Sequence, residues 1–146
     1  MKTIIASPRA PKAVGPYSQA VEAGGALYVS GQLPIDAAAG RMAEGIEAQT
    51  RQSLTNLGHI LREAGYDYSD VVKTTVLLQS IGDFAAMNAV YAEFFTAEMP
   101  ARMCYEVAAL PMGGAGRNRR RGGEITSADN PARCVPDVWD APFRFL

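Results

Sequence analysis

Apolar residues recur at helical spacing in two segments of the chain, residues 44–65 and 83–95. Gly65 stands where a left-handed residue ends a helix, and Asp83 stands at the expected N-cap of the second segment. This period places the apolar side chains of each segment on one face. We therefore predict two amphipathic helices that cover an apolar layer.

Shorter runs between Pro and Gly turns have the alternation or the β-branched content that is typical of strands. In one of them, Leu27 and Val29 alternate with Tyr28 and Ser30, which is the period of a half-buried strand. The predicted strand regions are residues 2–7, 19–36 (two strands around a Gly24-Gly25 turn), 71–80 and 99–111.

The resulting order, β-β-β-α-β-α-β, belongs to the α+β or α/β class. Two helices of this kind must cover one face of one sheet, because each has a single apolar face to bury. The other face of the sheet would then be bare. In a chain this small, a bare apolar face predicts an oligomer.

Composition agrees with a single globular domain, since 48% of the 146 residues are hydrophobic and 20% are charged. The net charge of −1 argues against a wholesale polyanion binder. Two cysteines do not make a disulfide framework, and neither a secretion signal nor a long apolar run is recognisable. We expect a cytoplasmic protein without a membrane-spanning segment.

Arg102 is the most unusual residue of the predicted strands, because it interrupts an otherwise apolar run. A guanidinium in such a place needs a partner, since a lone buried charge is costly. One interpretation is a structural ion pair with Glu106 or with another acid. The other is a clamp for a substrate carboxylate, whose two oxygens match the planar fork of arginine.

Cys104 lies two residues further and would share a strand face with Arg102. A cysteine on a strand is more often a small core side chain than a nucleophile. His59 is the single histidine and falls on the first predicted helix, so neither a metal-ligand cluster nor a Ser-His-Asp arrangement is expected. We expect neither a metal nor a cofactor.

Three motifs carry a resemblance to a known family. They are G-P-Y-S-Q at residues 15–19, S-G-Q-x-P at residues 30–34 and P-A-R-x-x-x-E-V-A at residues 100–108. From residue 1 to about residue 112 the chain resembles the YjgF/RidA (reactive intermediate deaminase) family, also called the L-PSP endoribonuclease family. The resemblance implies an α+β, chorismate-mutase-like fold with one mixed sheet, two helices on one face, and a homotrimer with clefts between subunits.

The implied activity is the hydrolysis of enamine and imine intermediates, such as 2-aminoacrylate, to a 2-keto acid and ammonia. The resemblance implies two catalytic residues, Arg102 on the substrate carboxylate and Cys104 with a backbone acceptor for the substrate nitrogen. It also implies substrate-binding roles for Tyr17, Ser30, Gly31 and Asn88. Two alternatives stay open: a non-catalytic trimeric protein that binds small carboxylates, and an endoribonuclease or translation inhibitor.

The last part of the chain, residues 113–146, departs from this pattern. We therefore divide the chain into a family-like domain at residues 1–112 and an atypical tail at residues 113–146. The resemblance implies a final strand with a Glu, thirteen residues after Cys104, that activates or orients the attacking water. That position is Arg117, and loss of the Glu would impair the hydrolysis. Residues 113–146 carry six arginines against four acids, but the short R-N-R-R-R run lacks interleaved aromatics and argues little for a nucleic-acid partner. Ile125 and Thr126 would form at most a poor substitute edge strand.

A shift of the reading frame explains the departure. With suitable codons, residues 114–121 (G-A-G-R-N-R-R-R) encode A-L-V-E-I-D-A when they are read one nucleotide later. That heptapeptide is a strand of the expected kind, and its Glu codon overlaps Arg117. We therefore hypothesise a one-nucleotide slip after about Gly113.

The slip has a direct test in the gene. We expect the nucleotides that encode residues 114–121 to read A-L-V-E-I-D-A in the neighbouring frame, because a slip leaves the original bases in place. Resequencing of this stretch, together with an intact mass of the purified protein, checks the expectation. A neighbouring frame that encodes no such strand would exclude the slip.

Overall fold

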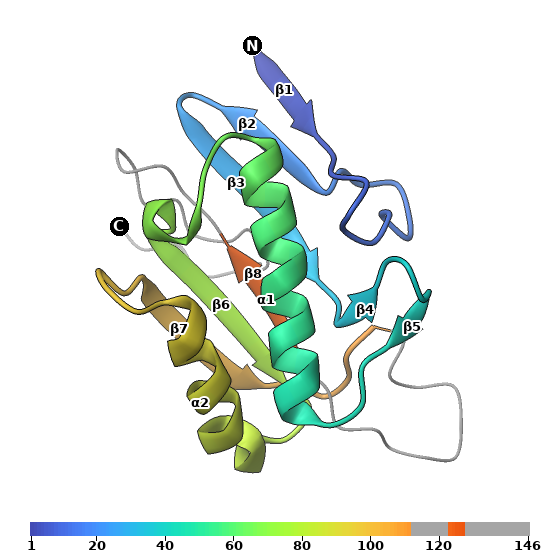
Figure 1. The fold of residues 1–146 in the computed structure, drawn as a ribbon, viewed down its shortest axis with the longest axis vertical. Helices are drawn as coiled ribbons and strands as arrows, with labels where there is room; N and C mark the ends of the chain where they lie inside the picture. The colour runs from blue at the N-terminus through green and yellow to red at the C-terminus, as the bar shows by residue number, and fades with distance from the viewer. Residues whose placement is uncertain (112–122, 128–146) are drawn as a thin grey trace.

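The computed structural model describes residues 1–111 and the strand 123–127 (Figure 1). Its main elements are β1 (Lys2–Ile5), β2 (Ala20–Ala23), β3 (Ala26–Gln32), β4 (Ile35–Asp36), β5 (Arg41–Met42), α1 (Ile46–Glu63), β6 (Lys73–Leu78), α2 (Phe84–Phe94), β7 (Ala101–Glu106) and β8 (Gly123–Ser127). Short 3₁₀ turns at Tyr68–Asp70 and Ile81–Asp83 precede β6 and α2.

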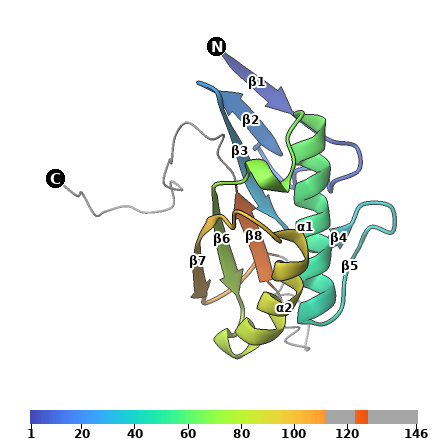
Figure 2. The ribbon, with the colours of Figure 1, turned by 60° about the vertical axis from the view of Figure 1, so that its left-hand side comes forward.

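The described strands form one mixed sheet in the order β1-β2-β3-β8-β6-β7, beside a small β4-β5 hairpin. β6 and β7 pair in parallel, and the other neighbours pair antiparallel. Figure 2 shows both helices on the same side of this sheet, with α1 over β3 and β8. The predicted single sheet with two helices on one face is therefore confirmed.

The core lies between the helices and this face of the sheet. Leu27 and Val29 of β3 are buried against it, whereas Tyr28 between them is exposed on the other face, as the alternation predicts. Each fully buried side chain of this size contributes about 1.5–3 kcal/mol. α1 faces the sheet with a set of fully buried residues, namely Leu54, Leu57, Ile60 and Leu61.

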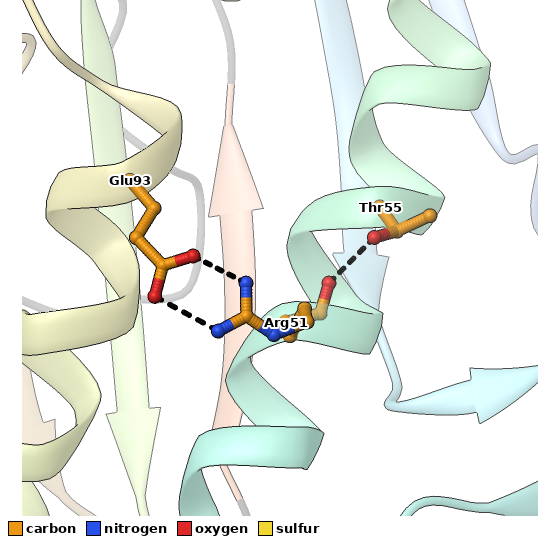
Figure 3. A network of polar contacts seen from close by, with 3 residues as sticks. All are labelled: Arg51, Thr55 and Glu93. Atoms are coloured by element: carbon orange, nitrogen blue, oxygen red, sulfur yellow. Dashed lines mark hydrogen bonds and ion pairs between the residues drawn. The ribbon is translucent and has the colours of Figure 1, made fainter.

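Polar contacts fix α2 against α1 on the solvent side. The Arg51 guanidinium donates to both carboxylate oxygens of Glu93, with Nη2–Oε1 at 2.8 Å, and the Thr55 hydroxyl donates to the Arg51 carbonyl (Figure 3). The guanidinium holds the pKa of Glu93 below its ordinary value. Because the pair is exposed, it adds little to stability and mainly defines how the two helices lie together.

α1 also passes close to the segment that follows it. A Cβ at Gly58 would lie 2.2 Å from the Tyr68 hydroxyl, so a side chain has no room there. That hydroxyl donates to the Leu54 carbonyl at 2.7 Å and fixes the chain as it enters β6.

β8 corrects one expectation of the sequence analysis. Ile125 and Thr126 do form a strand, but it lies between β3 and β6 in the interior of the sheet and not at an edge. The physical reason is that β3 and β6 run in the same direction with a gap between them. Their facing N–H and C=O groups need a partner, and an antiparallel strand supplies it on both sides.

The second helix begins as expected at Phe84, although not through the expected cap. Asp83 occupies the N-cap position, but its side chain makes no capping hydrogen bond because its backbone is already helical. The Ser80 side chain instead accepts from Gly82 N–H at the preceding turn. Gly65, with a φ of 83°, follows α1 as predicted.

Within residues 1–111 and 123–127, no helix has the length and apolar character needed to cross a bilayer. Arg117 and Cys134 lie outside the described residues. The division of the chain at residue 112 stays a prediction, and the strand β8 joins the two parts of the chain in one sheet.

Candidate functional site

Arg102 lies on β7, in register with Thr74 of β6, at one edge of the described sheet. Its guanidinium carbon is 4.7 Å from the centre of the Tyr91 ring and 5.6 Å from the centre of the Phe84 ring. Both rings belong to α2. The arginine is therefore held by two aromatic rings, whose electron-rich faces attract a cation.

None of the described carboxylates is within ion-pair distance of Arg102. The Glu106 carboxylate, two residues beyond Cys104, instead accepts a hydrogen bond from the Ile81 backbone N–H at 2.7 Å. The interpretation of Arg102 as the ion-pair partner of Glu106 is therefore wrong. Because ring contacts leave the in-plane N–H donors of a guanidinium unshared, Arg102 has donors to offer an anionic ligand.

The Tyr91 side chain is itself held by a buried hydrogen bond with β6. Its hydroxyl lies 2.8 Å from the Thr74 hydroxyl, and both residues are buried. Burial raises the pKa of Tyr91, and the hydrogen bond with Thr74 and the charge of Arg102 only partly oppose this shift. The ring therefore stays neutral and is held in one place under the guanidinium.

Asn88 belongs to the same part of α2. Residues 84, 88 and 91 are spaced i, i+4 and i+7, so they lie on one face of the helix. Asn88 therefore lies between the two rings that contact Arg102, and its side chain is half-buried. Asn88 thus shares one face of α2 with the two rings that contact Arg102, and its role in substrate binding stays a prediction.

The Cys104 thiol is half-buried and packs against the core. Burial raises the pKa of the thiol, and the nearby charge of Arg102 opposes this only in part. A raised pKa leaves less thiolate near neutral pH, which argues against Cys104 as a nucleophile. The side chain therefore fits a wall of the site better than a reacting group.

The backbone of Cys104 has a different property. Ala101 N–H donates to the Val72 carbonyl and Val107 N–H donates to the Leu78 carbonyl, both at 2.9 Å. Alternate residues of a parallel strand turn their backbone groups to the same neighbour. Those of Arg102 and Cys104 therefore face the free edge of the described sheet, where a ligand can reach the Cys104 carbonyl.

Ser30 and Gly31 form a β-bulge in β3. Val29 pairs with Ser127 and Gln32 pairs with Ile125, so β3 uses one residue more than β8 over this interval. The Ser30 hydroxyl donates to the Ser18 carbonyl at 2.7 Å, which ties the bulge to the loop that precedes β2. Bulges are frequent beside active sites because they redirect the chain.

Tyr17 stands in that same loop, with 48% of its surface exposed. Its hydroxyl accepts from Val14 N–H at 3.2 Å. The loop is fixed from inside by the buried Gln19, whose side chain accepts from Ser7 N–H and donates to the Pro11 carbonyl, both at 2.7 Å. Tyr17 is therefore an exposed ring on an anchored loop beside Ser30.

The six predicted site residues form two groups in one chain. Arg102, Cys104 and Asn88 lie at β7 and α2, whereas the other three lie at β3 and in the loop that precedes β2. β8 and β6 separate β3 from β7, which corresponds to three strand spacings or about 14 Å. The structure therefore does not bring the two groups together within a single chain.

Sequence reasoning missed the residues that hold Arg102, namely Phe84, Tyr91 and Thr74. The aromatic residues at i and i+7 of α2 are a usable signal, but the helical period by itself indicates only that they share the apolar face of the helix. Among the described residues, no three His, Cys, Asp or Glu side chains gather closely enough to hold a metal ion.

The family described as "Endoribonuclease L-PSP" matches residues 7–115 of this chain. The matched range ends in the glycine-rich run where the sequence departs from the expected pattern. A relative from Capra hircus named 2-iminobutanoate/2-iminopropanoate deaminase is 50% identical over 115 residues, which cover 78% of this chain and 84% of the relative.

Solved structures give the same picture. The YjgF gene product of Escherichia coli is 39% identical, with a TM-score of 0.80 over 88% of this chain and 98% of that chain. TdcF of E. coli, solved with bound serine, is 37% identical, with a TM-score of 0.78 over 88% of this chain and 97% of that chain. The α+β fold therefore matches that of YjgF structures.

The Thr74–Tyr91 hydrogen bond has a measurable energetic signature. Tyr91→Phe or Thr74→Val alone leaves a buried hydroxyl without its partner, so each should lower the free energy of unfolding by about 1–3 kcal/mol. The double variant leaves no such group and should cost about as much as one single change. Chemical denaturation of the four proteins at one concentration tests this, and additive losses would contradict it.

Proposed function

Because the chain belongs to the endoribonuclease L-PSP family, whose members include YjgF and RidA, we propose that it is a 2-iminobutanoate/2-iminopropanoate deaminase. Its substrates are small 2-imino acids and their enamine tautomers such as 2-aminoacrylate, and its products are a 2-keto acid and ammonia. The observation that supports this proposal most directly is the setting of the Arg102 guanidinium. Two rings hold it, and none of the described carboxylates pairs with it. Relatives that carry this name, with about half of their aligned residues identical to this chain, support the proposal.

In this proposal Arg102 binds the substrate carboxylate with two parallel N–H···O bonds. Such a charge-assisted pair is worth roughly 1.5–3 kcal/mol. A small imino acid offers few other handles, so the clamp also orients the reacting carbon. The bound serine in TdcF is a small amino acid with the same carboxylate, which agrees with a site of this kind.

Two neighbours complete this side of the site. The Cys104 carbonyl at the free edge accepts a hydrogen bond from the substrate nitrogen and helps to orient the C=N bond. Phe84, with 38% of its surface exposed beside the guanidinium, offers an apolar wall for the short substrate side chain. Asn88 between the two rings adds a polar group at the rim.

The complete site is proposed to lie between subunits of a homotrimer. The helix-free face of the sheet exposes Tyr28, Met103 and Tyr105, each more than a third accessible, which is an unusual set for a monomer's surface. Packing of three such faces would bury these side chains. It would also bring Tyr17, Ser30 and Gly31 of one subunit toward Arg102 of the next.

The assembly is tested by mass in solution. We expect sedimentation equilibrium to give three times the chain mass, and Tyr105→Glu to shift the protein toward monomer because a charge would be buried without a partner. Glu98→Gln, an exposed change outside the sheet, is the control. A monomeric parent chain would contradict the trimer and the composite site with it.

Arg102→Lys tests the catalytic proposal. A dehydratase generates 2-aminoacrylate, and the release of ammonia and pyruvate is followed with and without the protein. Lysine keeps the charge but loses the planar fork, so kcat/KM should fall about 10- to 150-fold, equivalent to the 1.5–3 kcal/mol of the pair. Arg41→Lys, the same change at an exposed residue of β5, should leave kcat/KM unchanged.

The alternatives correspond to distinct outcomes. If the parent chain does not accelerate the release of ammonia and pyruvate over buffer, the deaminase proposal is contradicted. If the parent chain then binds a small carboxylate and the Arg102→Ala variant does not, the chain is a non-catalytic binding protein. Cleavage of RNA by carefully purified protein would favour the nuclease. A cytoplasmic location stays a prediction.

A further inference from the structure

Glu106 is the last residue of β7, four positions after Arg102 on the same strand. β6 and β7 run in the same direction, so β7 ends beside the point where the chain leaves β6 toward α2 (Figure 1). There the Glu106 Oε2 accepts a hydrogen bond from the Ile81 backbone N–H at 2.7 Å. The carboxylate thus joins the strand of the candidate site to the 3₁₀ turn that leads into α2.

The turn before α2 is shaped by contacts within itself. Gly82 N–H donates to the Ser80 hydroxyl oxygen at 3.3 Å, and Asp83 N–H donates to the Ser80 carbonyl at 3.1 Å. These bonds join residues two or three positions apart, so they set the form of the turn but not its place beside the sheet. The Ile81 side chain is 51% exposed and adds little packing. The Glu106 bond, in contrast, spans 25 positions and ties the turn to β7.

Phe84 follows this turn directly and is the first residue of α2. Its ring centre lies 5.6 Å from the Arg102 guanidinium carbon, and 38% of its surface is exposed. Burial therefore does not fix this ring, in contrast to Tyr91, which is buried and bound to Thr74. The Asp83 side chain makes no capping hydrogen bond to the first turn of α2. The position of the Phe84 ring therefore depends on the path of the turn before it.

The Glu106 carboxylate extends from a firmly held backbone. Glu106 is in register with the fully buried Leu78, and the N–H of the next residue, Val107, donates to the Leu78 carbonyl at 2.9 Å. None of the described cationic side chains is within ion-pair distance of Glu106. A carboxylate makes a shorter and stronger hydrogen bond with an N–H than a neutral acceptor does. The bond to Ile81 is therefore the polar contact through which this side chain acts in the described part of the chain.

We propose that Glu106 is a positioning residue of the site, an inference that rests on the proposed deaminase function. By holding the Ile81 N–H it fixes the turn, and with the turn it fixes the Phe84 ring beside the Arg102 guanidinium. A guanidinium held by two fixed rings keeps its N–H donors in one direction, toward the substrate carboxylate. Glu106 itself touches neither the substrate nor the attacking water, and its effect passes through Phe84 and Arg102.

The hydrogen bond of Glu106 can be separated from its charge by substitution. Glu106→Ala removes the acceptor and Glu106→Asp withdraws it by one methylene, so both should release the turn. Glu106→Gln keeps an oxygen at the same reach and should hold Ile81 as the parent does. Phe84→Ala removes the ring on which the turn acts. Once that ring is gone, loss of the Glu106 bond should have no further effect on the site.

Binding of pyruvate, the product of the proposed reaction, reports on the carboxylate clamp without turnover. Calorimetric titration of Glu106→Ala should give a dissociation constant about 5- to 20-fold above the parent's, because a displaced guanidinium loses contact with the carboxylate. Glu106→Gln should stay within about threefold of the parent, and Glu106→Ala/Phe84→Ala should bind as Phe84→Ala alone does. Glu22→Ala on β2, which removes a carboxylate bound to the Tyr66 hydroxyl, is the matched control and should bind pyruvate as the parent does.

Three results would overturn the positioning role. They are parent-like binding by Glu106→Ala, binding by Glu106→Gln as weak as that of Glu106→Ala, and losses of Glu106→Ala and Phe84→Ala that multiply in the double variant. Sedimentation and melting show whether each variant keeps the parent's assembly. If Glu106→Ala does not fold, Glu106→Asp takes its place in the same comparison.

The 2-aminoacrylate assay separates this inference from the proposed function. If pyruvate binding follows the expected pattern but the parent releases no ammonia, Glu106 still positions a carboxylate clamp and the deaminase proposal fails. If the parent is active but binds pyruvate too weakly to titrate, kcat/KM of the same variants should show the same pattern. A parent that neither binds pyruvate nor converts 2-aminoacrylate overturns both proposals.

Discussion

The contact of the Arg102 guanidinium with the Tyr91 ring is the interaction on which the candidate site depends. It joins three elements, because Arg102 belongs to β7, Tyr91 belongs to α2, and the Tyr91 hydroxyl is bound to Thr74 of β6. A carboxylate could hold the same arginine more strongly, but it would also occupy the donors that a substrate needs. Two rings and a buried hydroxyl pair hold the side chain and leave those donors available.

The position of α2 is in turn set by contacts far from the arginine. Arg51 and Glu93 join the helices on the solvent side, and the Tyr91, Phe95 and Tyr68 rings pack in series beneath them. A shift of α2 would move the Phe84 and Tyr91 rings together with Asn88. The parallel pairing of β6 and β7 fixes the other half of the contact, because it sets Arg102 level with Thr74.

How much the sequence predicts depends on how local each feature is. The two helices and the strands of residues 1–111 follow from apolar period and from Pro and Gly turns, which are properties of neighbouring residues. Arg102 is found because a charge interrupts an apolar strand. Its ring partners are missed because they lie 18 and 11 residues away, and only the crossover from α2 to β7 brings them together. β8 is misplaced for a similar reason, since a five-residue strand without a period is positioned by the open edges of β3 and β6.

The separation of the two groups of site residues argues for an assembled site. β8 and β6 occupy the space between the Ser30–Gly31 bulge and Arg102, and each is paired with a neighbouring strand on both sides. No adjustment of loops in one chain can remove two paired strands. A substrate with few heavy atoms cannot reach across them either. If both groups contact one substrate, they must come from different copies of the chain, and the bare, aromatic face of the sheet is the surface through which those copies would meet.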